Sequence, residues 1–288
     1  MEKLKHSDIV DIVKIARYED MPAGDATTDI TIDPQLRTKL YLKARESLVF
    51  CGEAVLQEVL KAYDPCLEAN MKVQDGDEVA AGDVIAEISG PLAPMLSAER
   101  VFLNFLQRMS AIATMTSEYV ELVRGTNLKI YDTRKTTPGM RVLEKYAVRC
   151  GGGCNHRMSL SDGVMLKDNH FAHIGSSPRK KLEELVEKSR RRKGVKYVCV
   201  EVDRLDQLET VLEVKGVDLI LLDNMTCPQL REAVRMRDAS GSSVELEASG
   251  GVTRKTLREI AETGVDRVSV GALTCSAGVV DLGLDETA

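Results

Sequence analysis

The stretch YVCVEVDRLDQLETVLEVKGVDLILLDNM, residues 197–225, decides the fold class that the sequence predicts. It contains a short apolar strand expected at 197–203, a helix expected at 205–215 and a second apolar strand expected at 219–225. Short apolar runs joined by helical segments are typical of parallel sheets, whose strands are buried on both faces. The stretch therefore predicts a strand–helix–strand unit.

The same rhythm recurs through the second half of the chain. Further strands are expected at 128–134, 163–169, 244–251 and 267–273, and further helices at 179–192, 228–237 and 254–263. Six buried strands with intervening helices predict an α/β barrel of the TIM-like type. A doubly wound sheet is the alternative, but no glycine-rich dinucleotide-binding turn follows a first strand.

The first 125 residues have a different character, because helices there mix with short strands. Helices are expected at 7–17, 52–62 and 98–123, and a strand at 38–44. Two Gly-Asp turns, at Gly76 and Gly82, surround short strands between 73 and 90. This region is therefore expected to form a separate α/β layer.

Composition limits the class of protein. The chain has 288 residues and a net charge of −6, which does not favour nucleic-acid binding. No apolar run approaches the roughly 18 residues of a membrane-spanning helix, and the charged start lacks the apolar region of a signal peptide. Seven scattered cysteines do not form a disulfide framework. We expect a cytoplasmic protein that binds neither membrane nor nucleic acid.

A local excess of basic residues interrupts this acidic chain. Residues 132–170 contain seven Lys and Arg against four Asp and Glu. Active sites of such barrels lie at the carboxyl ends of the strands, and the expected strand at 128–134 leads directly into this segment. The segment therefore predicts a site for a small anion.

The predicted strand ends sort by charge along the chain. The early ends carry Arg134, Lys135 and Lys167, with His156 and Arg157 between them; the middle ends carry Glu201, Asp203 and Asp223; and the late ends carry Ser249, Gly250, Gly251, Gly271 and Ala272. An Arg fork binds carboxylates, and paired acids suit Mg²⁺ or sugar hydroxyls. The late glycines, followed by a helix whose expected N-cap is Thr253, are suited to binding phosphate.

Several segments resemble quinolinate phosphoribosyltransferase, also called nicotinate-nucleotide pyrophosphorylase (carboxylating). They occur in order along nearly the whole chain: GDATT (24–28), ERVFLNFLQRMSAIAT (99–114), DTRKTTPGMRVLEKYAVRCGGGCNHRMSLSDGVMLKDNH (132–170), EVD (201–203), LLDNM (221–225), EASGGV (247–252) and VSVGALT (268–274). The resemblance implies an N-terminal α/β sandwich domain, 1–114, and a TIM-like barrel, 115–274. The tail 275–288 is expected to pack back on the sandwich.

The resemblance also implies a reaction. Quinolinate and phosphoribosyl pyrophosphate (PRPP) would give nicotinate mononucleotide, CO₂ and pyrophosphate, with Mg²⁺ as cofactor, in the de novo synthesis of NAD. It implies a homodimer with shared active sites, and assembly of dimers into a hexamer stays open.

Site residues follow by motif. The residues that would bind quinolinate are Arg100 of the neighbouring subunit, Arg134, Lys135, His156, Arg157 and Lys167. Those that would bind PRPP are Glu201, Asp223, Ser249, Gly250, Gly251, Gly271 and Ala272, with Glu201 and Asp223 also near Mg²⁺. The expected catalytic set is Lys135, Lys167, Glu201 and Asp223, and either Lys167 or water would protonate C2 of the product.

Two positions depart from the family pattern. Ala111 replaces a usual glycine, and Cys275 follows GALT where the family usually has histidine, which puts PRPP affinity in question. Three alternatives remain: a ModD-like paralogue of the same fold, a Schiff-base lyase using Lys167, and a non-catalytic sensor.

Overall fold

The computed structural model describes residues 3–167, 170 and 178–288. These residues divide into two compact units. Unit 1 comprises 1–117, 135–152 and 272–288, and unit 2 comprises 118–134 and 153–271. Each unit is described by itself below.

Unit 1 is built on a four-stranded antiparallel sheet with the order β12-β1-β5-β3. Its strands are β1 (Arg37–Ala44), β3 (Glu68–Met71), β5 (Val84–Pro91) and β12 (Leu282–Asp285). The C-terminal strand β12 pairs with β1, with Tyr41 opposite Asp285. A second, two-stranded sheet joins β2 (Leu48–Val49) to β4 (Glu78–Val79).

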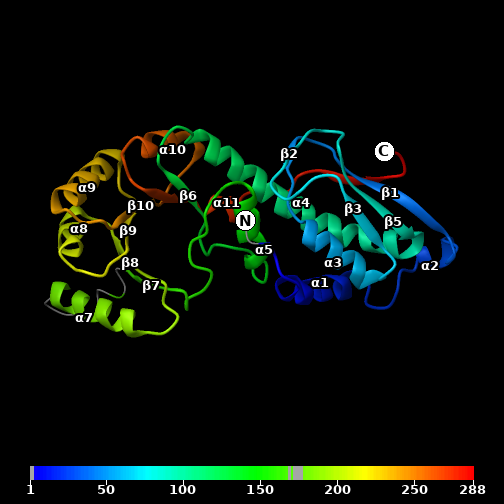
Figure 1. The fold of residues 1–288 in the computed structure, drawn as a ribbon, viewed down its shortest axis with the longest axis horizontal. Helices are drawn as coiled ribbons and strands as arrows, with labels where there is room; N and C mark the ends of the chain where they lie inside the picture. Colours follow the sequence, from blue (N-terminus) through cyan, green and yellow to red (C-terminus); the bar gives the residue numbers. More distant parts are fainter. Residues whose placement is uncertain (1–2, 168–169, 171–177) are drawn as a thin grey trace. The chain divides into compact units, whose positions relative to one another are not determined.

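Helices complete unit 1, as Figure 1 shows. They are α1 (His6–Asp20), α2 (Thr28–Thr31), α3 (Glu53–Tyr63), the first part of α4 (Leu92–Leu122), α5 (Arg141–Cys150) and α11 (Ala272–Cys275). Apolar side chains of the sheet and the helices, including Leu42, Ile85, Leu56 and Phe102, are fully buried and form the core. The α/β sandwich that the resemblance implied is therefore present.

Unit 2 contains six parallel strands in the order β6-β11-β10-β9-β8-β7. They are β6 (Lys129–Tyr131), β7 (Gly163–Leu166), β8 (Tyr197–Val202), β9 (Leu219–Asp223), β10 (Glu245–Ser249) and β11 (Arg267–Ser269). The order runs in sequence from β7 to β11 and then returns to β6. This is the cyclic order of a barrel, and it confirms the predicted fold class.

The junction between β6 and β7 differs from the others. Among the described residues no hydrogen-bonded β-ladder joins these two strands, but Cys154 forms a parallel β-bridge to Tyr131 of β6.

Four helices alternate with the strands of unit 2: α7 (Pro178–Arg191) follows β7, α8 (Leu205–Leu212) follows β8, α9 (Cys227–Ser240) follows β9, and α10 (Arg254–Ala261) follows β10. In Figure 1 they lie around the outside of the strands, from α10 at the top to α7 at the lower left.

One element differs from the expected pattern. The predicted strand 267–273 ends at Ser269, and residues 272–275 form the short helix α11. Local sequence could not distinguish the two, because Ala, Leu and Thr are compatible with either state. No helix among the described residues is long and apolar enough to cross a membrane.

Candidate active site

Alternate residues of the parallel strands face the interior of unit 2. Cys199, Leu219 and Leu221 form a buried cluster, against which Met165 and Tyr197 pack. Since side chains alternate between faces along a strand, residues two positions further on point to the same side. That rule places Lys167 and Glu201 on the inner face, directly above this cluster.

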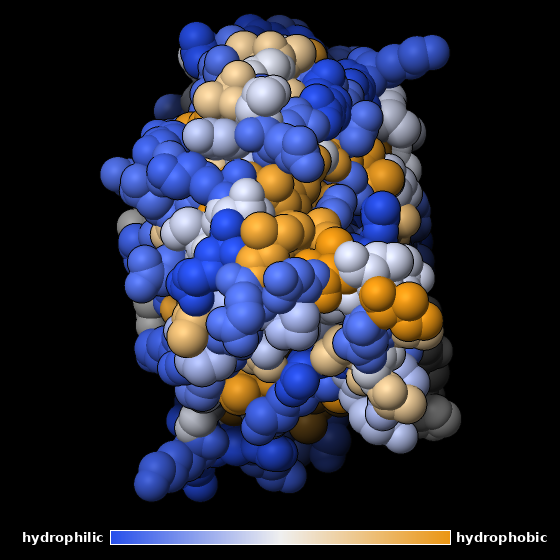
Figure 2. Space-filling model, turned by 90° about the vertical axis from the view of Figure 1, so that its right-hand side faces the viewer, coloured by the Kyte–Doolittle hydropathy of each residue, from blue (hydrophilic) through white to orange (hydrophobic). Residues whose placement is uncertain are grey.

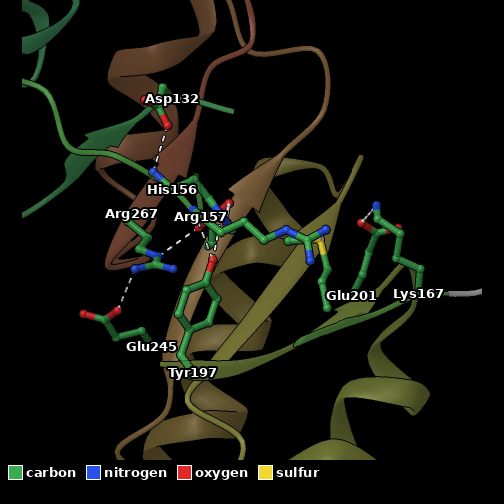
Figure 3. Close-up of polar contacts among 10 residues, drawn as sticks. Asp132, His156, Arg157, Lys167, Tyr197, Glu201, Glu245 and Arg267 are labelled. Carbon is green, nitrogen blue, oxygen red and sulfur yellow. Dashed lines mark hydrogen bonds and ion pairs between the residues drawn. The ribbon is translucent and has the colours of Figure 1, made fainter. Parts of the chain in front are cut away.

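Lys167 and Glu201 form an ion pair between Nζ and Oε2 at the carboxyl ends of β7 and β8. The side chain of Lys167 is 40% exposed and that of Glu201 14% exposed, so the pair opens to solvent on the lysine side. Figure 3 shows the two side chains meeting at this end of the sheet. The structure thus brings together two residues that the sequence placed at separate strand ends.

Asp223 and Ser249 lie at the ends of neighbouring strands and are paired in register. Asn224, in a left-handed conformation with φ 54°, donates its backbone N–H to the Ser249 carbonyl at 2.8 Å. Its side-chain amide donates to Asp223 Oδ2 at 2.9 Å. These bonds fix the carboxylate of Asp223 beside the turn that follows β10.

That turn requires glycine. Gly250 has φ +89°, and a Cβ there would lie 2.1 Å from Asn224 Oδ1. Gly251 also has positive φ, and Thr253 then caps α10, accepting a bond from the Thr256 N–H. The predicted N-cap at Thr253 is confirmed, and the sequence Ser249-Gly250-Gly251 presents an exposed turn before a helix N-terminus, which suits an anion.

The predicted basic residues are distributed over both units. Arg134 is half-buried in unit 2, and Lys135, the next residue, is exposed in unit 1. The carbonyl of Lys135 accepts a hydrogen bond of 2.6 Å from Thr274 Oγ1. Arg100 is exposed on α4 in unit 1. Gly271 lies two residues after the end of β11, as the last residue of unit 2, and Ala272 begins α11.

His156 and Arg157 lie inside unit 2. Asp132, which is fully buried, accepts the His156 backbone N–H at 2.8 Å and the Asn155 amide at 2.7 Å. Tyr197 Oη lies 2.9 Å from His156 Nδ1. The guanidinium of Arg157 donates to the Gly163 carbonyl at 2.9 Å. Both side chains are therefore held in place by the barrel interior.

A buried charge cluster escaped the sequence reasoning. Glu247 is fully buried and accepts from Arg267 Nε at 2.8 Å, while its other oxygen lies 3.5 Å from His156 Nε2. Arg267 also donates to Glu245 at 3.0 Å and lies over the Tyr131 ring. The sequence places Glu247 at a predicted strand end, two positions before Ser249, but it does not indicate that Glu247 is buried or that it pairs with Arg267.

A cavity of about 150 Å³ borders this cluster. Among its lining residues, Tyr197, Leu219, Glu245 and Arg267 are the first residues of their strands. The cavity therefore lies toward the amino ends of the strands, away from Lys167, Glu201 and Asp223. Asp168 and Asn169, which continue the predicted strand end after Lys167, lie outside the described residues.

An α/β barrel with cations, acids and a glycine turn at one end of its strands defines an enzyme class that binds phosphorylated and carboxylated small molecules. Comparison with known proteins makes the assignment specific. The model of the quinolinate phosphoribosyl transferase C-terminal domain matches residues 112–285, and that of the N-terminal domain matches 25–110. The chain belongs to this family.

Individual proteins similar to this chain support the same family assignment. The chain is 38% identical over 285 residues to the probable nicotinate-nucleotide pyrophosphorylase [carboxylating] of Bacillus subtilis, covering 99% of this chain and 95% of that protein. It is 40% identical over 283 residues to the Mycobacterium leprae nicotinate-nucleotide pyrophosphorylase, covering 96% of each. The crystal structure of NadC from Streptococcus pyogenes superimposes with a TM-score of 0.92 at 38% identity, covering 99% of this chain and 98% of that one.

Proposed function

We propose that this protein transfers the phosphoribosyl group of PRPP to the ring nitrogen of quinolinate and removes the C2 carboxylate as CO₂. The products are nicotinate mononucleotide, CO₂ and pyrophosphate. The observation that carries the proposal is the arrangement of Lys167, Glu201, Asp223 and the Ser249–Gly251 turn at the carboxyl ends of adjacent strands. A cation, two acids and an anion-binding turn match the three parts of the two substrates.

The basic residues account for the choice of acceptor. Quinolinate carries two adjacent carboxylates, and Arg134, Arg157 and Lys167 supply cations for both, with His156 and Lys135 completing the predicted set. A guanidinium binds a carboxylate bidentately. Nicotinate, which has a single carboxylate, would leave a cation unpaired in the closed site, and this costs affinity.

The acids and glycines account for the donor. The Ser249–Gly251 turn and the Gly271–Ala272 peptide would bind the 5′-phosphate through backbone N–H groups. Glu201 and Asp223 would accept hydrogen bonds from the ribose hydroxyls. Their negative charge also stabilises the positive character that develops at the sugar as pyrophosphate leaves.

The same two carboxylates fit the Mg²⁺ that the family implies. Glu201 and Asp223 end the adjacent strands β8 and β9, and carboxylate oxygens are the ligands that Mg²⁺ prefers. When bound, the ion would neutralise charge on the pyrophosphate leaving group.

Lys167 has a second expected role. Once the ring nitrogen carries ribose, its positive charge stabilises the electron pair that remains at C2 when the C2–carboxylate bond breaks and CO₂ leaves. C2 then takes a proton, and the Lys167 ammonium, held by Glu201, can supply it. A water molecule is the other candidate donor.

A second copy of the chain would complete the site, because Arg100 is expected to reach the neighbouring subunit's quinolinate. Arg100 is exposed on α4, and its guanidinium forms no hydrogen bond or ion pair with the described residues. Figure 2 shows hydrophobic side chains gathered near the centre of one face, with hydrophilic ones around them. Unit 1 also exposes Ile15, Tyr18 and Ile30. Such apolar surface favours association, either as a dimer or as a hexamer of three dimers.

The cysteines support a reducing cytoplasm as the place of action. Among the residues that the structure describes, all seven cysteines are free thiols. A Schiff-base lyase is the other enzyme class considered, but its lysine must be free to attack a carbonyl carbon, whereas Lys167 Nζ is engaged in an ion pair with Glu201.

One assay tests the proposal. The protein, quinolinate, PRPP and Mg²⁺ are mixed, and nicotinate mononucleotide and CO₂ are measured; omission of each reactant is the control. We expect one CO₂ for each mononucleotide. A folded protein that forms neither product would refute the activity and favour the ModD-like paralogue or a sensor. Arg134→Ala should abolish quinolinate binding, and retained affinity would refute its assigned role.

Shared sites are tested by complementation. Arg100→Ala and Lys167→Ala are each expected to be inactive. In a reassociated equal mixture, half of the dimers are mixed and each holds one intact site, so about a quarter of wild-type activity should return. No recovery, with mixed dimers shown to form, would place Arg100 outside the site.

A further inference from the structure

The buried charge cluster of unit 2 lies just below the proposed quinolinate site. Glu247 and Arg267 are paired in register on the neighbouring strands β10 and β11, and their side chains form an ion pair of 2.8 Å. Glu247 is fully buried, and Arg267 is 9% exposed. Taking two charges out of water is costly, so a pair at this depth calls for a role beyond filling space.

The second contact of Glu247 is with His156. Glu247 Oε1 lies 3.5 Å from His156 Nε2, and the imidazole is only 6% exposed. Burial by itself raises the pKa of Glu247, but the neighbouring His156 and the charge of Arg267 lower it below its usual value. Glu247 therefore remains a carboxylate and an acceptor.

The other side of the imidazole receives hydrogen bonds. The backbone N–H of Arg157 donates to His156 Nδ1 at 2.9 Å, so Nδ1 carries no proton in this arrangement. Tyr197 Oη lies 2.9 Å from the same nitrogen and donates to it, because burial raises the pKa of the Tyr197 phenol. The ring proton is then on Nε2, facing Glu247.

Arg157 connects this cluster to the strand ends. Its guanidinium donates to the Gly163 carbonyl at 2.9 Å and contacts Met165 Sδ at 3.6 Å, both on β7. Figure 3 shows its side chain extending from His156 in the direction of Lys167 and Glu201. The direction of the Arg157 side chain thus depends on a backbone that His156 holds.

We propose that Glu247 is a positioning residue: by accepting Nε2–H, it fixes the tautomer of His156 and thereby the placement of Arg157 for a substrate carboxylate. This role rests on the proposed reaction, since it assigns Arg157 to quinolinate. The tautomer of a histidine is set by the hydrogen bonds of its two ring nitrogens, and Glu247 Oε1 is the carboxylate oxygen that lies 3.5 Å from Nε2.

The substitution Glu247→Gln tests whether Glu247 fixes the tautomer of His156, because glutamine has nearly the same shape as glutamate. A glutamine amide can donate to Nε2, which moves the ring proton to Nδ1. Nδ1–H would then face the Arg157 N–H, and two donors cannot form a hydrogen bond. The Arg157 N–H would then keep only its longer hydrogen bond, of 3.3 Å, to Tyr197 Oη, so the backbone that carries the Arg157 side chain would be held less firmly.

Glu245 provides a matched control on the same strand. It also pairs with Arg267, at 3.0 Å, but its side chain is 45% exposed, whereas Glu247 is fully buried. Glu247→Gln should raise the KM for quinolinate by at least about tenfold, as for a lost partner of a binding residue, with the KM for PRPP within about twofold. Glu245→Gln should leave both within about twofold.

A spectroscopic readout is independent of turnover. The chain has four histidines, so ¹⁵N-histidine NMR resolves His156 once a His156→Asn variant has identified its signals. We expect the Nε2–H tautomer in the wild type and in Glu245→Gln, and a mixture or the Nδ1–H tautomer in Glu247→Gln. An Nε2–H tautomer in Glu247→Gln with unchanged quinolinate KM would overturn the proposal.

These experiments distinguish a failure of the proposed reaction from a failure of the proposed role of Glu247. A wild type without any turnover refutes the proposed reaction, while the NMR result still decides the tautomer. If Glu247→Gln does not fold, Glu247→Asp carries the test, because it withdraws the carboxylate by one methylene. Unchanged His156 Nε2 resonances and an unchanged quinolinate KM in that variant would also overturn the proposal.

Discussion

The guanidinium of Arg108 on α4 binds the fully buried carboxylate of Glu144 on α5, with Nη2 2.9 Å from Oε1. Glu144 also accepts from the backbone N–H of Thr137 at 3.1 Å and from its hydroxyl at 2.8 Å. Arg108 further donates to the carbonyls of Gly278 and Thr274. One ion pair within unit 1 therefore fixes the segment that leads from Lys135 into α5.

Loss of this pair should destabilise unit 1. Glu144→Gln is expected to lower the free energy of unfolding by about 3 kcal/mol, because a buried cation–carboxylate contact is broken. Urea unfolding measures the change. Glu118→Gln, which removes an exposed ion pair with Arg254, is the control and should change it by less than about 1 kcal/mol. Equal effects in the two variants would contradict the assignment.

The Glu247–Arg267 pair can be tested for stability separately from its proposed role. Arg267→Met should cost about 3–5 kcal/mol, because Glu247 is left as an uncompensated buried charge. The double variant Arg267→Met/Glu247→Leu should recover most of that loss but not the quinolinate affinity. A double variant as unstable as the single one would show that packing, rather than charge, dominates at this position.

In the Ser249–Gly251 turn, the two glycines should differ in how well they tolerate a larger residue. Gly250→Ala places a Cβ against Asn224 at a positive φ, and we expect a loss of about 2–3 kcal/mol in unfolding free energy and a higher KM for PRPP. At Gly251, φ is +61° and a Cβ would meet nothing within 4 Å. Gly251→Ala should cost only about 1 kcal/mol. Thermal unfolding and PRPP kinetics compare the two, and equal losses would contradict the geometry.

Asp25 should make stability depend on acid pH. Its carboxylate accepts from the Thr28 hydroxyl at 2.6 Å, from the Thr28 N–H at 3.0 Å and from Ser97 Oγ at 2.8 Å. The Thr28 hydroxyl, followed by the other donors, lowers the pKa of Asp25 from 3.8 to about 2. The stabilisation is thus fully present above the unfolded pKa and is lost as pH falls through the folded value.

The test compares the free energy of unfolding of the wild type with that of Asp25→Asn at several pH values. The variant should be less stable at pH 7, and the gap in unfolding free energy should shrink as the pH falls from about 4 to about 2. Chemical unfolding at several pH values measures it. A gap that stays constant with pH would mean that Asp25 contributes only through packing or neutral hydrogen bonds.

Much of the fold could be predicted from local pattern. The alternation of apolar strands and helices between 128 and 273 predicted the parallel strands β6 to β11, and the structure confirms them with shorter ends. The predicted strand at 267–273 was too long, because its last residues form α11. The pairing of β12 with β1 joins residues more than 200 positions apart, and no local periodicity encodes such a contact.

In the candidate site, too, some features could be predicted from the sequence and others could not. The strand pattern of the sequence placed Lys167, Glu201, Asp223 and the Ser249–Gly251 turn at the carboxyl ends of strands. Parallel strands bring those ends to one edge of the sheet. The burial and the pairing of several charged residues were not predicted. Glu247, Arg267, Glu144 and Arg108 look like ordinary charged residues in the sequence, since burial depends on what packs around them.

The sequence by itself determined the class of fold, the basic segment at 132–170 and the residue types that meet the substrates. It could do so because strand period and side-chain chemistry are local properties. Only the tertiary structure decided that Lys167 binds Glu201 and that Glu247 stands between Arg267 and His156. These relationships depend on strand register and burial, which arise when segments distant along the chain pack together.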